Sequence, residues 1–591
     1  EFQDFTEDKD DQTTRYILRW NLEKAEPDAP LSPPKEPIVF WLDNAIPTEY
    51  RDAVREGILW WNKAFERIGI KDAIVVKQMP DDADWDHADM RYNVIRWVTS
   101  PSSGYAVALF RANPLTGQIL NASITVDANM TRFARAEFKR MVNPLSAFDD
   151  EPLPVNPFVC NMAEDAAYQA WFGSMALKVM QSPKSTRISE SEYVKQYIRE
   201  VVAHEMGHIL GLRHNFVAST LNSTKELAEH DHIKHRGMTA SVMDYTPVNI
   251  FALHSPRSAY WTQGLGVYDY WAIEYGYKPS KARTPKAELP MLRAIARRCT
   301  EPGLAYRGDE FADSVDPLIT RFDLGKDPLE YWAAIFRDVN AMIPQLPAKA
   351  VKSGENYYEL TRSFNGLLSM YARAASVVSR YIGGVHLRQN HRGDPNEKPP
   401  VEPVSAVDQK RALALLTRYV FSPNAFNFPK EIYLKLAPNP YPNYEAMLTS
   451  RPRFDAPVRD TFSAIQVNTL RRLFRPQTLS QIANNEFKAS KPDETLSMTA
   501  LFEQVGNAVN AEIINGTNVP ALRRLLQRTY LRTLADMLVN PDSEVPDDAK
   551  MLARYHLRRL KSQILAVRNR PLDATTRVHL DEMLSEIERV L

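Results

Sequence analysis

The chain of 591 residues carries 73 Lys and Arg against 73 Asp and Glu, so no net charge favours nucleic acid or an anionic membrane as a partner. Hydrophobic residues make up 44% of the sequence, enough to fill several folded cores. Its two cysteines, Cys160 and Cys299, exclude a disulfide-stapled scaffold and a zinc ribbon of four thiolates, while a single disulfide between them stays open. No apolar run approaches the ~18 residues that span a bilayer, so we expect no transmembrane segment.

The first third of the chain predicts a mixed sheet with one crossover helix. A polar and then proline-rich lead-in occupies residues 1–36. After it, apolar residues recur every three or four positions over 47–68, which is typical of an amphipathic helix. Short apolar runs bounded by turn residues predict three strands and a hairpin, at 37–43, 73–79, 92–98 and 104–126. Residues 131–190 are irregular and proline-dotted, and we interpret them as an insertion.

A strong helix follows this insertion, and helical patterns dominate the rest of the chain. The helix begins near Ser191 and carries a buried apolar stripe through YVKQYIREVVAHEMGHILGL. After about residue 280 the strand signal nearly vanishes, and helical patterns recur at 328–343, 355–382, 405–420, 456–474, 497–513, 520–539, 546–568 and 573–590. We therefore expect an α/β (α+β) domain over residues 37–280, followed by a large all-α region over 281–591.

The segment that points to chemistry is HEMGHILGLRH, which begins at His204. On a helix, His204 and His208 lie one turn apart on one face, which lets two imidazoles bind one zinc ion at ~2.0–2.1 Å. Glu205 lies beside them and is placed to accept a proton from a zinc-bound water. Gly211 permits the helix to stop and turn, because glycine tolerates positive φ, and the chain can then bring back His214 as a third ligand. The fourth coordination position would stay open.

This segment resembles the signature of the metzincin zinc endopeptidases, H-E-x-x-H-x-x-G-x-x-H followed by a Met-turn. Downstream, the run SVMDY has the S-x-M-x-Y form of the astacin and serralysin branches. The resemblance implies that Met243 packs beneath the zinc as the floor of the site. It also implies that Tyr245 is a switchable fifth ligand, which binds the metal or swings to stabilise the oxyanion.

The resemblance covers about residues 37–280 and implies a metzincin-like catalytic domain with a mixed sheet and a zinc-binding helix. The amino-acid sequence of this region, including PTEYRDAVREGILWWNKAFERIGI, is similar to that of large multidomain bacterial zinc metalloproteases. We therefore expect an exported protein (periplasmic, cell-surface or secreted), although the chain begins at Glu1 and shows no signal segment. Two departures from the family pattern are the long insertion and the 29 positions from His214 to Met243.

The expected function is zinc-dependent hydrolysis of peptide bonds in a protein or peptide substrate. Glu205 is the expected general base, which later delivers the proton to the leaving amine, and Tyr245 is the candidate oxyanion donor. The substrate is expected to lie extended along an edge strand within residues 104–127. One catalytic Zn²⁺ is the expected cofactor, whereas no motif supports a structural Ca²⁺. The alternative is a catalytically silent zinc-containing scaffold that binds partners through its helical half.

Other interpretations of nearby residues stay open. In a gluzincin the third ligand is a glutamate on a later helix, and Glu226 and Glu229 lie at suitable spacings. Arg213 and Asn215 flank the third histidine and are candidates either for supporting it or for a structural role. Three further histidines predict either a solvated loop or a second metal site, namely His230, His232 and His235.

Overall fold

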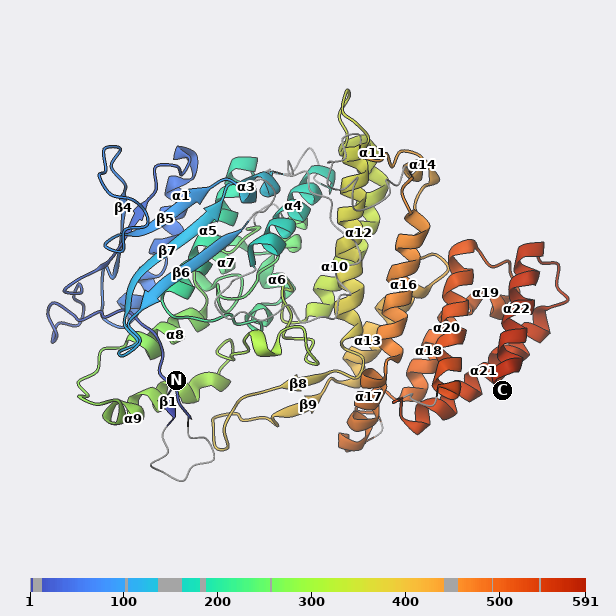
Figure 1. Ribbon diagram of the computed structural model, residues 1–591. Helices are drawn as coiled ribbons and strands as arrows, with labels where there is room; N and C mark the ends of the chain where they lie inside the picture. The colour runs from blue at the N-terminus through green and yellow to red at the C-terminus, as the bar shows by residue number, and fades with distance from the viewer. Residues whose placement is uncertain are drawn as a thin grey trace.

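The computed structural model describes residues 2–3, 13–100, 105–135, 162–180, 188–255, 258–439, 455–491, 493–540 and 544–591. The molecule is elongated, with a five-stranded sheet and its helices at one end and the last helices of the chain at the other (Figure 1). Two long helices, α10 (Pro328–Met342) and α12 (Tyr358–Ser379), stand between the two ends. Within the described residues, no helix has both the length and the apolar character needed to cross a membrane.

The sheet has the strand order β4-β3-β5-β7-β6, in which only β6 runs antiparallel to its neighbour. Its strands are β3 (Ile38–Leu42), β4 (Ile74–Gln78), β5 (Asn93–Val98), β6 (Ala106–Ala112) and β7 (Ile119–Asp127). Buried and half-buried residues alternate along β3, because successive side chains point to opposite faces. The predicted mixed sheet is confirmed, and β6 forms one of its edges.

Two helices, α1 (Thr48–Leu59) and α5 (Glu190–Ile209), pack against each other and against the sheet (Figure 1). The single helix predicted after the first strand is instead broken, and the chain resumes as α2 (Asn62–Arg67). The break places Trp61 inside the core, fully buried, where its indole Nε1 donates a hydrogen bond to Ala203 O at 2.9 Å. This bond ties the crossover segment to the helix that carries the histidines.

The insertion contributes a long helix, α4 (Met162–Met180), that lies between α5 and α12. On one side, the Tyr193 hydroxyl donates to Ala170 O at 2.9 Å. On the other side, the ring of Trp171 packs against Gly366, where an added Cβ would overlap it. The insertion is therefore the element that joins the sheet domain to the first long helices of the C-terminal region.

Parts of the insertion, residues 136–161 and 181–187, lie outside the described residues. Cys160 is among them, so its pairing with Cys299 also lies outside what the structure describes. Cys299 itself is half-buried, and its Sγ lies 3.9 Å from Asp394 Oδ2.

Helices dominate the region after residue 280, but the all-α expectation is wrong in one place. Two short strands, β8 (Val385–Leu387) and β9 (Val401–Pro403), pair as an antiparallel hairpin. Three-residue strands are too short to show the alternation that identifies a strand. The prolines in and before β9 favour a loop between helices over a strand. Helices α9 (Pro285–Ala296) and α17 (Pro476–Lys488) also escape prediction. Helix α9 contains a second proline, Pro290, in its interior, and Pro476 of α17 follows directly on the preceding helix, where a proline predicts an end.

The remaining helices vary in length from single turns to long amphipathic runs, and most of the predicted runs are present. They are α3 (Asn129–Ala134), α6 (Thr224–Leu227), α7 (His230–Arg236), α8 (Val267–Tyr277), α11 (Leu346–Lys349), α13 (Ala406–Leu416), α14 (Lys430–Tyr433), α16 (Val458–Phe474), α18 (Met498–Val509), α19 (Ala511–Asn515), α20 (Ala521–Val539), α21 (Asp547–Val567) and α22 (Ala574–Val590). Packing of their apolar faces gives the C-terminal region a helical core that is continuous with that of the sheet domain.

The contact between α1 and α5 depends on Gly57, and this gives a test of the packing. A Cβ on Gly57 would lie 2.6 Å from Arg199 O, so Gly57→Ala must push the two helices apart. We expect a loss of about 1–3 kcal/mol, seen as a lower melting temperature in calorimetry. Gly264→Ala is the control, because its nearest neighbour would be 3.8 Å away. Equal melting temperatures for the two variants would contradict the close packing.

Candidate metal centre

Helix α5 supplies two histidines and ends in the glycine turn that precedes the third. It begins at Glu190, one residue earlier than predicted, where the Ser189 side chain accepts a hydrogen bond from Glu192 N. At its other end Gly211 has φ +92°, a conformation that residues with a Cβ rarely adopt. A Cβ there would also overlap Leu18 O of the lead-in. The turn therefore requires glycine for two independent reasons.

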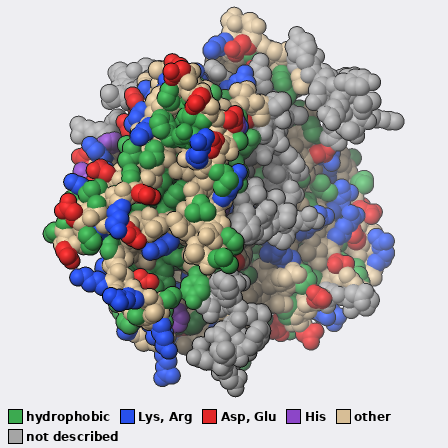
Figure 2. Space-filling model, turned by 60° about the vertical axis from the view of Figure 1, so that its left-hand side comes forward, with side chains coloured by type: hydrophobic (Ala, Val, Ile, Leu, Met, Phe, Trp, Pro, Cys, Tyr) green, Lys and Arg blue, Asp and Glu red, His purple; other side chains and the backbone are tan. Residues whose placement is uncertain are grey.

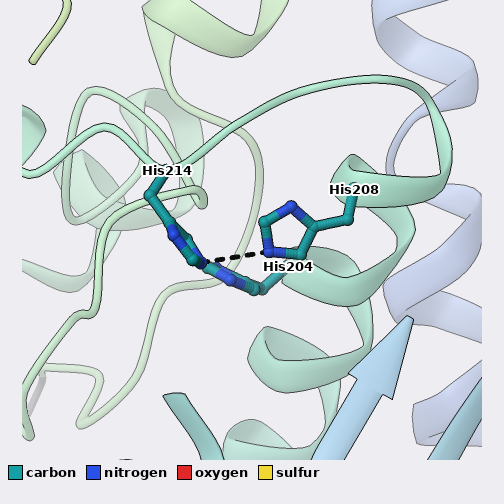
Figure 3. Close-up of side chains that lie close together, drawn as sticks. All are labelled: His204, His208 and His214. Carbon is teal, nitrogen blue, oxygen red and sulfur yellow. Dashed lines mark hydrogen bonds between the residues drawn. The ribbon is translucent and has the colours of Figure 1, made fainter. Parts of the chain in front are cut away.

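His204, His208 and His214 point their imidazole rings toward one another (Figure 3). Their candidate ligand nitrogens all lie within 4.8 Å of one another, and His208 Nε2 is 3.1 Å from His214 Nε2. Two rings come from successive turns of α5, and the third comes from the chain that returns after the glycine turn. In the part of the chain that the structure describes, no other group of three or more His, Cys, Asp or Glu side chains has this geometry.

Each imidazole is anchored through its Nδ1 atom by an oxygen from a different segment. Nδ1 lies 2.7 Å from Val242 O in His204, 3.0 Å from Leu212 O in His208, and 2.8 Å from Asp309 Oδ1 in His214. Because carbonyl and carboxylate oxygens only accept, we assign the proton of each ring to Nδ1, which donates. The Nε2 lone pairs are then left to face the centre of the triad, as zinc ligands require.

Burial keeps the rings of His204 and His208 in the form that binds metal. Desolvation, helped by the neighbouring His214, lowers the pKa of His208 to about 3. The pKa of His204 is lowered well below its usual range, again chiefly because burial penalises the charged ring. Both rings are therefore neutral at pH 7. Neutral, pre-oriented imidazole nitrogens at this spacing fit Zn²⁺.

The predicted Met-turn packs directly beneath the triad. Met243 is fully buried, and its Sδ contacts α5 at Gly207, where an added Cβ would overlap the sulfur. Asp269 of α8 holds the turn in place, because its carboxylate accepts hydrogen bonds from Ser241 Oγ at 2.6 Å and from Val242 N at 3.0 Å. Val242 thus donates its N–H to Asp269, and its carbonyl oxygen accepts the hydrogen bond that orients His204.

The ring of Tyr245 lies at the triad, and Glu205 is the next residue after the first ligand. Glu205 follows the first ligand on α5 and is fully buried. The ring of Tyr245 has its centroid 4.7 Å from that of His214 and is packed between two phenylalanines, Phe216 at 5.0 Å and Phe322 at 5.4 Å. Of the two candidate catalytic side chains, Tyr245 thus lies beside the histidines, and the role of Glu205 stays a prediction.

A segment beyond residue 280 completes the wall behind the third ligand. Asp309 accepts a hydrogen bond from His214, and the backbone of Arg307 supports the two residues that follow this histidine. Its N–H donates to Asn215 Oδ1 at 2.9 Å, and its carbonyl accepts from Phe216 N at 2.8 Å. The domain boundary near residue 280 stays a prediction. These hydrogen bonds connect residues on either side of it, because they link residues 214–216 to residues 307–309.

Sequence reasoning missed the two aspartates that support the centre. Asp269 lies three residues after Gly266 at the start of α8, a spacing that marks a helix cap but says nothing of the Met-turn. Asp309 is 95 residues away from His214, and no motif marks it. Of the two residues beside the third ligand, Arg213 pairs with Glu310 at 2.5 Å, next to Asp309.

The competing interpretations of the nearby residues are not supported. Glu226 accepts a hydrogen bond from Ser223 N at 2.8 Å and caps α6, and Glu229 precedes α7, so neither takes the place of His214. The histidine cluster lies on helix α7 rather than on a loop, and His232 Nε2 is bonded to Asn222 Oδ1 at 2.9 Å. A second metal site is absent from the described residues.

A mixed sheet, a helix with two histidines, a third histidine after a glycine turn and a buried Met-turn together define a metzincin-type zinc protein. A family model described as Met-zincin matches residues 186–516, more than half of the chain, and the chain belongs to this family. The match extends well into the helical half, beyond the resemblance over residues 37–280. Membership points to a zinc metallopeptidase. Comparisons with curated proteins and with solved structures found no match.

The anchoring of the third ligand gives a prediction for zinc binding. In Asp309→Ala, His214 loses its acceptor, and we expect the zinc affinity to fall by about 10–100-fold. Asp309→Asn keeps an acceptor oxygen and should lose less. Competition with a fluorescent chelator measures both affinities. Glu310→Ala, at the neighbouring half-exposed position, serves as the control and should bind zinc as the unmodified protein does. An unchanged affinity in Asp309→Ala would remove Asp309 from the metal centre.

Proposed function

We propose that the protein is a zinc-dependent endopeptidase. The observation that carries the proposal is the convergence of three anchored imidazoles. A buried carboxylate, Glu205, follows the first of them on α5. A zinc ion bound there supplies Lewis-acid chemistry, polarising the scissile carbonyl and lowering the pKa of a water to about 7. His204, His208 and His214 would hold the ion, and the chemistry of proton transfer falls to the residues around them.

Glu205 is the proposed general base. It is fully buried next to His204, in a low-dielectric surrounding where charge interactions are stronger than in water. Its carboxylate takes the proton of the attacking water and then delivers it to the leaving amine, so that one side chain acts first as base and then as acid.

Tyr245 is the proposed oxyanion donor. Its ring packs against His214 and between two phenylalanines, and its backbone oxygen accepts a hydrogen bond from Phe322 N at 2.8 Å. These contacts fix the ring beside the triad. A phenol held in this way donates its O–H to the oxygen that becomes negative in the transition state.

The substrate is proposed to bind in extended form along the edge strand β6. Among the described residues, β6 pairs with β7 and no strand covers its outer side, and Leu109 at its centre is 54% exposed. An extended peptide can add to such an edge through backbone hydrogen bonds. On the face shown in Figure 2, acidic and basic side chains are interspersed, so side-chain pockets rather than overall charge would set the preference.

The proposal includes a place of action. Metzincins are often extracellular, and we propose that this family member also acts outside the cytoplasm on protein or peptide substrates.

The first test removes the general base. Glu205→Ala keeps all three histidines, so it should retain zinc and lose peptidase activity on casein by several orders of magnitude. Zinc content by elemental analysis and peptide release by mass spectrometry give the two readouts. Glu190→Ala, an exposed position on the same helix, should keep full activity. Full activity in Glu205→Ala would exclude the mechanism.

The second test concerns the oxyanion donor. Tyr245→Phe keeps the packing but lacks the hydroxyl, so kcat should fall about 10²–10³-fold while the zinc affinity changes little. Tyr275→Phe, at a half-exposed position on α8, is the matched control. Steady-state kinetics on a peptide with a single cleavage site separate kcat from KM. An unchanged kcat would remove Tyr245 from the reaction.

A further inference from the structure

A cavity of about 980 Å³ lies on the other side of the segment that supports His214. Its walls come from α8 and α9, from residues 299–307, and from the loop that connects β8 to β9. In Figure 1, α9 and the β8–β9 hairpin lie below the sheet, on the same side as α8. None of the three zinc ligands, nor Glu205 or Tyr245, lines it. The cavity is therefore separate from the proposed catalytic cleft, although Arg307 belongs to both walls.

The charged side chains around the cavity are unbalanced. Three acids line it, and each already has a partner: Glu301 with Arg298 (3.2 Å), Asp316 with Leu387 N (2.8 Å) and Asp394 with His391 N (2.6 Å). Twice as many cations line it, namely Arg293, Arg297, Arg307, Arg388, Arg392 and Lys398. The lining therefore has an excess of positive charge that its own acids do not neutralise.

Several of these cations have no carboxylate partner among the described residues. Arg297 lies 3.9 Å from Asp394 and Arg388 lies 2.5 Å from Glu402, whereas Arg293, Arg392 and Lys398 form no ion pair with a described residue. These three side chains line the cavity and are exposed. They add long-range attraction for an anion.

Arg307 is the cation inside the cavity wall. It is only 5% exposed, and its guanidinium donates to neutral oxygens, with Leu387 O at 2.6 and 3.0 Å and Gln389 Oε1 at 3.4 Å. Burial lowers the pKa of Arg307, although the charge of nearby Asp316 opposes this effect. A buried cation whose hydrogen bonds go only to neutral acceptors is costly, and an anion that enters the cavity would offset this cost. Guanidinium groups suit carboxylates and phosphates, because their N–H groups match the spacing of two oxygens.

The rest of the lining indicates an organic ligand. Trp271 and Tyr306 contribute aromatic surface, and the Trp271 indole is fixed because its Nε1 donates to Ile295 O at 2.8 Å. The volume of the cavity is typical of sites for small molecules, which span ~300–1,000 Å³. We propose that this cavity binds a small organic polyanion, whose carboxylate or phosphate groups are held by Arg307 at its wall and by Arg293 and Arg392 at its mouth.

The test is calorimetric titration of the full, zinc-loaded chain with two probes, propane-1,2,3-tricarboxylate and fructose 1,6-bisphosphate. We expect saturable binding of at least one probe at one site per chain, weakened by added salt. The probe that binds more tightly identifies the anionic group. Absence of saturable binding by both probes would overturn the proposal.

A pair of matched variants locates the binding. Arg293→Glu with Arg392→Glu should weaken the probe at least tenfold. Arg283→Glu with Lys286→Glu has the same change in net charge at exposed positions outside the cavity, and it should stay within about twofold. Arg293→Gln with Arg392→Gln provides a milder pair should the charge reversal impair folding, with an intermediate loss. Equal losses in the two charge-reversed pairs, or binding of a hexaglutamate peptide alone, would also contradict a small-molecule site in this cavity.

Discussion

The metal centre depends on one repeated interaction, the hydrogen bond from the Nδ1 side of each imidazole to a fixed oxygen. The three acceptors belong to the Met-turn, to the glycine turn and to a segment far along the chain. Each bond selects one tautomer and one ring orientation, so the site is arranged before any ion arrives. Burial adds to this by keeping the His204 and His208 rings neutral, which removes competition between protons and metal at these two ligands at neutral pH.

Close packing around α5 sets the positions of these acceptors. Gly207 lets the Met243 sulfur approach the helix backbone, and Trp61 packs against the same glycine. Asp269 then fixes the Met-turn from below through bonds to Ser241 and Val242. A core of this kind is stiff, because any side chain at Gly207 would collide with the Met243 and Trp61 side chains.

The local parts of this arrangement could be predicted from sequence. His204 and His208 share a helical face by their spacing, and Gly211 has a conformational reason to be where it is. The succession of strands along the chain also followed from hydrophobic periodicity, as did the helical segment after the first strand, although not its break at Trp60 and Trp61. Non-local partners could not be predicted, because an aspartate 95 residues from His214 leaves no periodic or spacing signal. The short β8–β9 hairpin was missed because very short strands lack a period. Helices α9 and α17 were missed because Pro290 interrupts the first and Pro476 suggests the end of the helix before the second.

The position of Asp309 has a consequence for how this protein can be divided. A fragment that ends at residue 280 would retain every zinc ligand, the Met-turn and the whole sheet, yet His214 would lose its acceptor and Asn215 would lose the backbone of Arg307. Tyr245 would also lose its contact with Phe322. A fragment that keeps the full support of the third ligand and of Tyr245 therefore has to extend at least to Phe322.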